Sequence, residues 1–267
     1  DSQNTYDINS NLTEKQADGK NVWENKQITP ASINSMDRSY ALFVGDNTSD
    51  RAEAVSRWCI YAKWDMAQCR NLEDYQENDK ALPGMLILES EKYALGSNLE
   101  KIKKLEEKGV IIVFGCLEDP RNIEENKDLM DFLGIYKVVS EKTELTGVKL
   151  FEGLLLGGEV VYETPEERQD LQLEIPWYQV GSGTKTYMVG LLDQTKQKKT
   201  VENEDLPTII WRNGIQGGSI FSVVGDYMKD STALGLLDGM VAEASEYYVY
   251  PVVNAQNLSM INFPAFA

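Results

Sequence analysis

The sequence predicts an α/β fold: a doubly wound, mainly parallel sheet that gains antiparallel strands in its second half. In the first half, short and continuously apolar runs alternate with amphipathic segments of helical period. Continuous apolar runs are typical of parallel strands that helices cover on both faces. In the second half, apolar–polar alternation and glycine-rich turns replace this pattern, which indicates hairpins. The 267 residues suffice for a full hydrophobic core.

The first predicted strand and helix follow each other directly. The run Tyr40–Val44 is apolar and ends in a Gly-Asp-Asn turn, as buried strands often do. Asp50 and Glu53 have the spacing of a capping box, so we expect Asp50 to cap the next helix. One apolar stripe along that helix carries Val55, Trp58, Cys59 and Ala62.

Two further strand–helix pairs follow. The apolar runs 85–88 and 110–114 predict strands. Between them, Ser97 and Glu100 form a second capping-box pattern, and Gly109 stands where a helix C-cap glycine belongs. Because crossovers between parallel strands are right-handed, three such pairs give a flavodoxin-like layout.

The third helix is expected to begin at Asp119-Pro120, with Asp119 as the cap and proline in the first helical position, and to run to Gly134. The second half predicts hairpin strands and one last helix. We expect a hairpin over 154–162, strands at 171–175, 186–192, 207–212 and 219–224, a charged loop over 194–205, and a helix capped at 230–232.

Composition divides the chain into three parts. Residues 1–37 are polar and read as an arm or linker, residues 38–250 form the α/β domain, and residues 251–267 read as the start of a linker to a downstream domain. The chain opens with Asp1, so we expect a piece of a longer extracytoplasmic protein. No run of 18 apolar residues is present, and we therefore expect membrane contact only through a removed anchor.

The charge balance and the cysteines narrow the possible partners. The chain carries 43 acidic and 26 basic side chains, a net charge of −17, which repels phosphate backbones, so we expect no nucleic-acid partner. Three cysteines do not form a disulfide framework, and Cys59 is expected in the core. With no histidine and no C-x-x-C pair, we expect no metal site and no cofactor.

Chemistry-bearing side chains follow several of the predicted strands, at the edge where open α/β sheets bind ligands. The candidate ligand-binding residues are Asp46, Glu89, Cys116, Glu118, Asp226 and Tyr227. Cys116, Glu118 and Asp226 are also the candidates for catalysis, as nucleophile or general acid–base groups. The alternative interpretation is that the carboxylates cap helices and accept hydrogen bonds from loop amides.

Aromatic side chains are candidate platforms for sugar rings, because aromatic faces stack on pyranose C–H surfaces. The candidates are Trp177, Tyr178, Trp211, Tyr227, Tyr247, Tyr248 and Tyr250. Trp211 lies in an apolar strand and is expected in the core instead. The cluster 247–250 is expected to pack at a domain boundary.

The segment 114–118 reads Phe-Gly-Cys-Leu-Glu and resembles the nucleophile elbow, Gly-x-Cys-x-Gly, of the class I glutamine amidotransferase-like fold, with trehalose-utilisation-like proteins as the nearest relatives. Cys116 matches the family's nucleophile, but Phe114 and Glu118 replace both glycines. Glu118 is expected to raise the pKa of the thiol. Where catalytic members carry a histidine after a late strand, this chain has Asp226, so the resemblance implies a non-catalytic copy.

The chain is also similar to an uncharacterised family of membrane-tethered bacterial proteins associated with exopolysaccharide synthesis. From this resemblance we expect a non-catalytic extracytoplasmic module that binds polysaccharide, or an envelope protein partner in exopolysaccharide production. The alternative function is a hydrolase or transferase that uses Cys116, or the carboxylates of Glu118 and Asp226.

Overall fold

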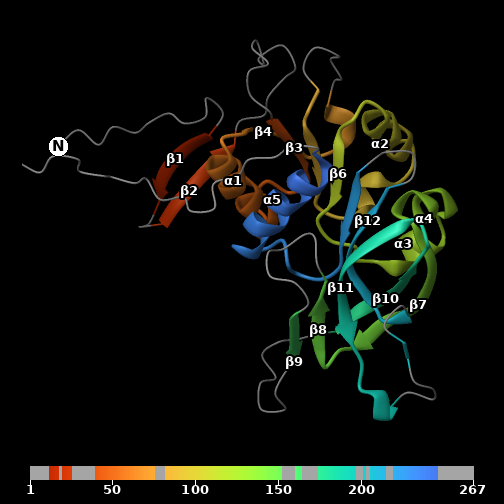
Figure 1. The fold of residues 1–267 in the computed structure, drawn as a ribbon. Helices are drawn as coiled ribbons and strands as arrows, with labels where there is room; N and C mark the ends of the chain where they lie inside the picture. The colour runs from red at the N-terminus through yellow and green to blue at the C-terminus, as the bar shows by residue number, and fades with distance from the viewer. Residues whose placement is uncertain are drawn as a thin grey trace, which may run out of the picture.

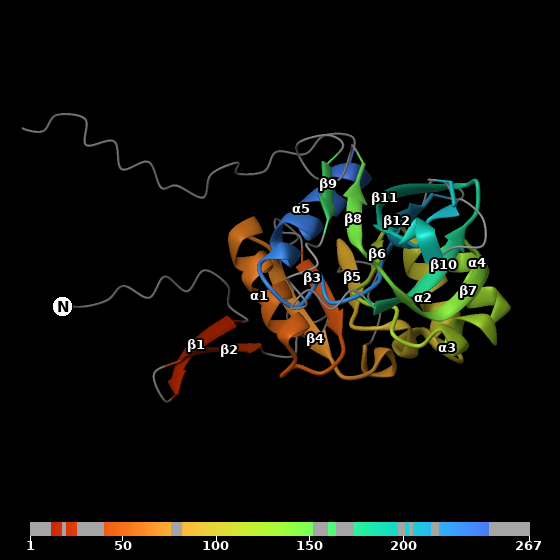
Figure 2. The same ribbon diagram turned by 90° about the horizontal axis from the view of Figure 1, so that it is seen from below.

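A twisted central sheet with helices on both faces dominates the molecule (Figures 1 and 2). The structure, a computed structural model, describes residues 12–17, 20–25, 40–75, 82–151, 160–163, 174–196, 201–202, 205–214 and 219–245. Within these residues the sheet has nine strands in the order β4-β3-β5-β6-β13-β12-β11-β8-β9. The chain therefore has the predicted α/β fold.

One half of the sheet is parallel. Its strands are β3 (Tyr40–Val44), β4 (Asp65–Cys69), β5 (Met85–Leu88), β6 (Ile111–Phe114) and β13 (Ile220–Val223). Each pairs in parallel with its neighbours in the order β4-β3-β5-β6-β13. Numbered among themselves, they have the 2-1-3-4-5 order of flavodoxin-like folds, with the switch point between β3 and β5.

The other half is antiparallel, as predicted for the second part of the chain. It contains β8 (Gly147–Leu150), β9 (Val160–Glu163), β11 (Thr184–Leu191) and β12 (Thr208–Asn213). The late strand β13 joins the halves, because it pairs in parallel with β6 and antiparallel with β12. A separate antiparallel ribbon pairs β7 (Ile135–Glu144) with β10 (Glu174–Val180).

The helices cover the two faces of the sheet. They are α1 (Asp50–Ala62), α2 (Asn98–Glu107), α3 (Pro120–Glu124), α4 (Lys127–Leu133) and α5 (Thr232–Ala244). Helices α1 and α5 pack on each other, and the Nε1 of Trp58 donates a 2.7 Å hydrogen bond from α1 to Asp238 of α5. Figure 2 shows α2 and α3 on the opposite side of the sheet from this pair.

Several predicted helix boundaries were wrong in detail. Ser49, not Asp50, caps α1, and its hydroxyl accepts from the Ala52 amide at 3.2 Å. Ser97 has helical backbone angles and makes no side-chain capping bond. The single helix predicted from Pro120 to Gly134 is two helices, because the side chain of Asn126 breaks the run and caps α4.

Other predicted boundaries are confirmed. The Asp119 side chain accepts from the Arg121 amide and caps α3, with Pro120 in its first turn. Gly134 ends α4 with φ of 73°, and a Cβ there would lie 2.6 Å from a methyl carbon of Thr184. Both the backbone angle and the close approach therefore favour glycine at this position.

The core lies on both sides of the parallel strands. All residues of β3, β5, β6 and β13 are buried. Cys59 and Trp211 are fully buried, as predicted. The indole Nε1 of Trp211 donates to the Leu133 carbonyl at 2.8 Å, which satisfies the buried donor and ties β12 to the end of α4.

In the predicted N-terminal arm, β1 (Leu12–Ala17) and β2 (Lys20–Asn25) form a two-stranded antiparallel hairpin. The first strand and the glycine turn of the hairpin predicted over 154–162, residues 171–173 of a predicted strand, and the segment 246–267 lie outside the described residues. Among the described helices, none has both the length and the apolarity to cross a bilayer.

Candidate functional site

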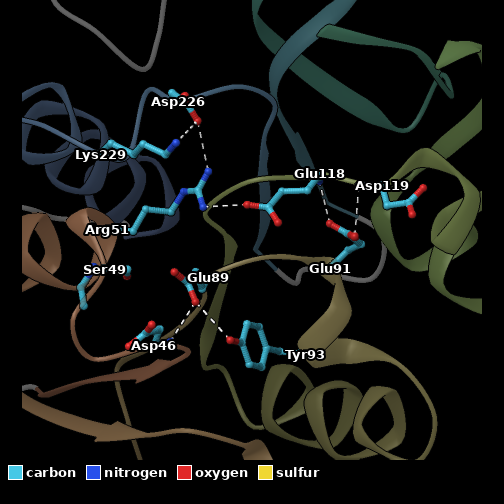
Figure 3. A network of polar contacts seen from close by, with 11 residues as sticks. Asp46, Ser49, Arg51, Glu89, Glu91, Tyr93, Glu118, Asp119, Asp226 and Lys229 are labelled. Carbon is cyan, nitrogen blue, oxygen red and sulfur yellow. Dashed lines mark hydrogen bonds and ion pairs between the residues drawn. The ribbon is translucent and has the colours of Figure 1, made fainter. Parts of the chain in front are cut away.

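The candidate residues lie at the carboxyl ends of the parallel strands. Asp46 follows β3, Glu89 follows β5, Cys116 follows β6 and Asp226 follows β13. Figure 3 shows the carboxylates of this edge in two sets of polar contacts: a network around Arg51 and a separate group around Glu89. Because these strands are parallel and adjacent around the switch point, the fold brings together side chains that are far apart in the sequence.

Arg51 lies at the centre of the network and was not among the predicted site residues. It stands in the first turn of α1, and its side chain is only 7% exposed. Its Nη1 donates to Glu118 Oε1 at 2.8 Å, and its Nη2 donates to Asp226 Oδ1 at 3.3 Å (Figure 3). The guanidinium fork therefore joins the loops that follow β6 and β13.

Lys229 completes a charge-balanced group. Its Nζ lies 2.8 Å from Asp226 Oδ1, so Asp226 contacts two cations. We call Arg51, Glu118, Asp226 and Lys229 the Arg51 quartet; it contains two positive and two negative side chains. Burial disfavours the charged guanidinium, but Cys116, Glu118 and Asp226 outweigh this effect and raise the pKa of Arg51.

Glu91 fixes the loop that carries Glu118. It belongs to the 3-10 helix η3 (Glu91–Ala94) and is 1% exposed. Its carboxylate accepts from the amide of Glu118 at 2.7 Å, from the amide of Asp119 at 3.2 Å and from Asn122 Nδ2 at 3.0 Å. This buried carboxylate therefore has a structural role, and it was also missed in the sequence.

Glu89 and Asp46 form a second group at the switch point. Glu89 Oε2 accepts from the Asp46 amide at 2.9 Å and from the Tyr93 hydroxyl at 3.1 Å (Figure 3). Asp46 Oδ1 accepts from the amide and hydroxyl of Thr48, and these two bonds lower the pKa of Asp46. Glu89 and Asp46 therefore both accept hydrogen bonds from loop amides, which is the alternative interpretation given for these carboxylates.

Gly45 makes this approach possible. A Cβ at this position would lie 2.6 Å from the Cβ of Glu89 and 2.7 Å from its Oε2. A side chain there would displace Glu89 from the Asp46 amide. The glycine that ends the first apolar run is thus required for close packing between the β3 and β5 loops.

Cys116 is buried and poorly suited to nucleophilic attack. The residue is 4% exposed, and burial, the largest cause, raises the pKa of its thiol to about 11. Arg51 opposes this rise, whereas Glu118 and Asp226 add to it. The predicted effect of Glu118 on the thiol is thus present, but desolvation is larger.

The backbone around Cys116 also differs from the predicted sharp turn. The Leu117 amide donates to the Val223 carbonyl at 2.9 Å, so the chain continues beside β13 past the cysteine. Across the described residues, Lys63 is the single non-glycine residue with positive φ, so Cys116 is not held in the strained conformation of a nucleophile elbow. Helix α3 begins only at Pro120.

The aromatic candidates divide by burial. Tyr178 and Trp211 are fully buried, so neither ring is accessible to a sugar, and the prediction of Tyr178 as a sugar platform is wrong. Tyr227 is half-buried beside Gly225, and burial raises its pKa to about 12. Trp177 is half-buried at the surface of the β7–β10 ribbon. Tyr247, Tyr248 and Tyr250 lie outside the described residues.

The described residues contain no group of three cysteine, aspartate or glutamate side chains arranged to hold a metal ion. At the Arg51 quartet, Glu118 and Asp226 have side chains 45% and 67% exposed, so oxygens of both remain accessible to a ligand with hydroxyl donors. Chemically, the edge offers hydrogen-bond acceptors whose charge is balanced by Arg51 and Lys229.

Comparison with known proteins supplies no family. No protein-family profile and no curated protein matches the sequence. Among solved structures, a ThuA-like protein from Bacteroides uniformis is similar, with 14% identity, a TM-score of 0.49, and coverage of 79% of this chain and 94% of that one.

A GMP synthase subunit from Thermoplasma acidophilum shares 12% identity at a TM-score of 0.42, with 78% of this chain and 94% of that chain covered. The carbohydrate deacetylase Agd3 shares 12% identity at a TM-score of 0.46; the match covers 74% of this chain and 32% of Agd3.

Proposed function

We propose that this chain is a non-catalytic module that binds polysaccharide. The main support for a non-catalytic role comes from Cys116. Its thiol is buried, its pKa is raised to about 11, and the chain has no histidine. A cysteine nucleophile needs a base to take its proton or a depressed pKa. The pKa of Cys116 is raised instead, and the chain has no histidine to act as the base.

The carboxylates support the same proposal. Glu118 and Asp226 are both held by Arg51, and Asp226 also by Lys229. These ion pairs give both carboxylates a structural role at the edge, as partners of Arg51 and Lys229. The alternative of a hydrolase or transferase that uses these groups is therefore not the one we favour.

We infer the ligand class from the accessible carboxylates at the carboxyl edge of the sheet and from the resemblance to the exopolysaccharide-associated family. Accessible carboxylate oxygens suit the many hydroxyl donors of a sugar chain. The net charge of −17 disfavours phosphate-rich partners. We place the module in an extracytoplasmic, exopolysaccharide-associated protein, as the resemblance to the membrane-tethered bacterial family implies.

Two measurements test the proposal. The protein is incubated with fluorogenic esters, amides and glycosides, and its retention in polysaccharide-containing native gels is compared with that in plain gels. We expect retention without turnover. Turnover that Cys116→Ala or Asp226→Asn abolishes would establish the alternative. If the protein migrates equally in plain gels and in every polysaccharide-containing gel, the proposed binding function is wrong.

A further inference from the structure

A cavity that none of the Arg51 quartet residues lines lies beside the β7–β10 ribbon. It has a volume of about 660 Å³, within the range of small-molecule sites. Its wall includes Trp177 of β10, residues 139, 140 and 142–146 that run from β7 towards β8, and Asp193 and Lys196 after β11. Three separate parts of the chain therefore build it.

Trp177 provides an aromatic wall in a fixed orientation. Its indole Nε1 donates to the Asp205 carbonyl at 3.1 Å. The neighbouring Gln179 holds the same loop, because its Nε2 donates to Asp205 Oδ1 at 3.0 Å. The next residue, Tyr178, is fully buried in the core, so the strand directs Trp177 to the cavity and Tyr178 to the interior.

Charged side chains at the cavity have capacity for further hydrogen bonds. Lys196 Nζ lies 3.8 Å from both Glu144 Oε2 and Asp193 Oδ2, which is too long for a hydrogen bond. The side chains of Lys196 and Glu144 are 69% and 83% exposed. A ligand hydroxyl can therefore bind between them with little cost of desolvation.

The local charges favour a neutral ligand. The cavity is lined by two lysines, Lys142 and Lys196, and by two acids, Glu144 and Asp193. Lys142 is also paired with Glu174 at 2.9 Å. No excess of positive charge is left among these described side chains to attract an acidic sugar, and the whole chain is strongly negative.

An indole face beside alternating donors and acceptors suits a pyranose ring, whose C–H surface stacks on the aromatic ring while its hydroxyls reach the polar side chains. We propose that this cavity is a saccharide-binding subsite of the module, and that it takes neutral sugar residues stacked on Trp177. This inference rests on the proposed polysaccharide-binding function and adds the β7–β10 ribbon to the Arg51 quartet as a second surface that contacts the sugar chain.

Isothermal titration calorimetry with defined probes tests the assignment. The neutral probes are cellopentaose, mannopentaose and N-acetylchitopentaose, and the anionic probe is pentagalacturonate. We expect at least one neutral probe to bind and the anionic probe not to bind. Trp177→Ala should weaken binding by about tenfold, as expected for the loss of one aromatic platform.

Two further variants distinguish a loss of sugar binding from a loss of folded structure. Lys196→Gln changes an exposed side chain and should also weaken binding, whereas circular dichroism should show an unaltered fold. Tyr136→Ala is the matched control, because Tyr136 is an aromatic residue of β7 that is 75% exposed and lines a different cavity. This variant should bind as the wild type does.

The possible outcomes separate the two proposals. Binding that survives Trp177→Ala and Lys196→Gln but is lost in Asp226→Asn would leave the module a polysaccharide binder and overturn the assignment to this cavity. Binding of pentagalacturonate alone would also overturn it. If no probe binds and no polysaccharide gel retains the protein, the proposed function itself fails.

Discussion

The guanidinium of Arg51 and the carboxylate of Glu118 are 67 residues apart in sequence and 2.8 Å apart in space. The first residue lies in the opening turn of α1, and the second lies in the loop after β6. This contact joins the two sides of the switch point at the carboxyl edge. It also places a permanent positive charge near the thiol of Cys116.

Replacing Arg51 should destabilise the protein. Arg51→Met keeps an apolar stem but leaves Glu118 and Asp226 without this cation, and we expect a loss of about 1–3 kcal/mol in the free energy of unfolding. Urea denaturation measures it. Arg57→Met is the control, because Arg57 is on the same helix with an exposed i,i+4 partner and should unfold near the wild-type midpoint. Equal midpoints for both variants would contradict the central role of Arg51.

Alkylation should reveal an unreactive Cys116. With its pKa at about 11, about one Cys116 thiol in ten thousand is ionised at pH 7. We expect iodoacetamide to label Cys116 slowly at pH 7 and faster as the pH rises above 9, as followed by peptide mass spectrometry. Arg51→Met should move this rise to higher pH. Protein unfolded in urea is the control, and rapid labelling of the folded protein at pH 7 would contradict the prediction.

Stability should fall in alkaline solution. Folding raises the pKa of Cys116 from 9.0 to about 11, and the pKa values of Tyr93 and Tyr227 from 10.0 to about 12. Between pH 9 and 12 the unfolded chain therefore binds fewer protons than the folded chain, and stability decreases with pH. Urea unfolding at pH 8, 9.5 and 10.5 measures the slope. Cys116→Ala should reduce the slope over pH 9–11 without abolishing it, because burial also raises the pKa of the Cys59 and Cys69 thiols. A stability that is constant over this range would disprove the linkage.

Removing the buried carboxylate of Glu91 should be costly. Glu91→Ala leaves the amides of Glu118 and Asp119 without their acceptor, and we expect a loss of about 2–3 kcal/mol. Glu91→Gln keeps one carbonyl oxygen and should lose less. Glu100→Ala is the control, since that side chain is 67% exposed. If Glu91→Ala and Glu100→Ala have the same urea midpoint, the carboxylate does not hold the loop.

The sequence predicted the parts of the fold in which burial leaves a clear pattern. β3, β5, β6 and β13 are fully buried, and their sequences are apolar except for Ser222 in β13. The edge strand β4 was not predicted, because its sequence Asp-Met-Ala-Gln-Cys has polar residues among the apolar ones. The strand β7 was also missed, since most of its residues are partly or fully exposed and its sequence lacks a regular alternation.

The candidate site was predicted through residues that follow strands, and this rule found Asp46, Glu89, Cys116 and Asp226. It could not find Arg51, because the rule ignores helices. A usable signal was present: Arg51 stands two residues after the cap of α1, and the first turn of a helix that follows a parallel strand lies at the same edge as the strand's end. The burial of Glu91 could not be predicted, since nothing in the sequence distinguishes a buried glutamate from an exposed one.

The position of β13 has a consequence for how the chain folds. Residues 220–223 pair with β6 on one side and with β12 on the other, so the last strand to be synthesised among those described is inserted into the middle of the sheet. Until it emerges from the ribosome, β6 has no partner on that side, and the two halves of the sheet are not joined. Such long-range pairing slows folding and leaves strand edges open to association. The nine-stranded sheet is thus complete only after residues 220–223 have been synthesised.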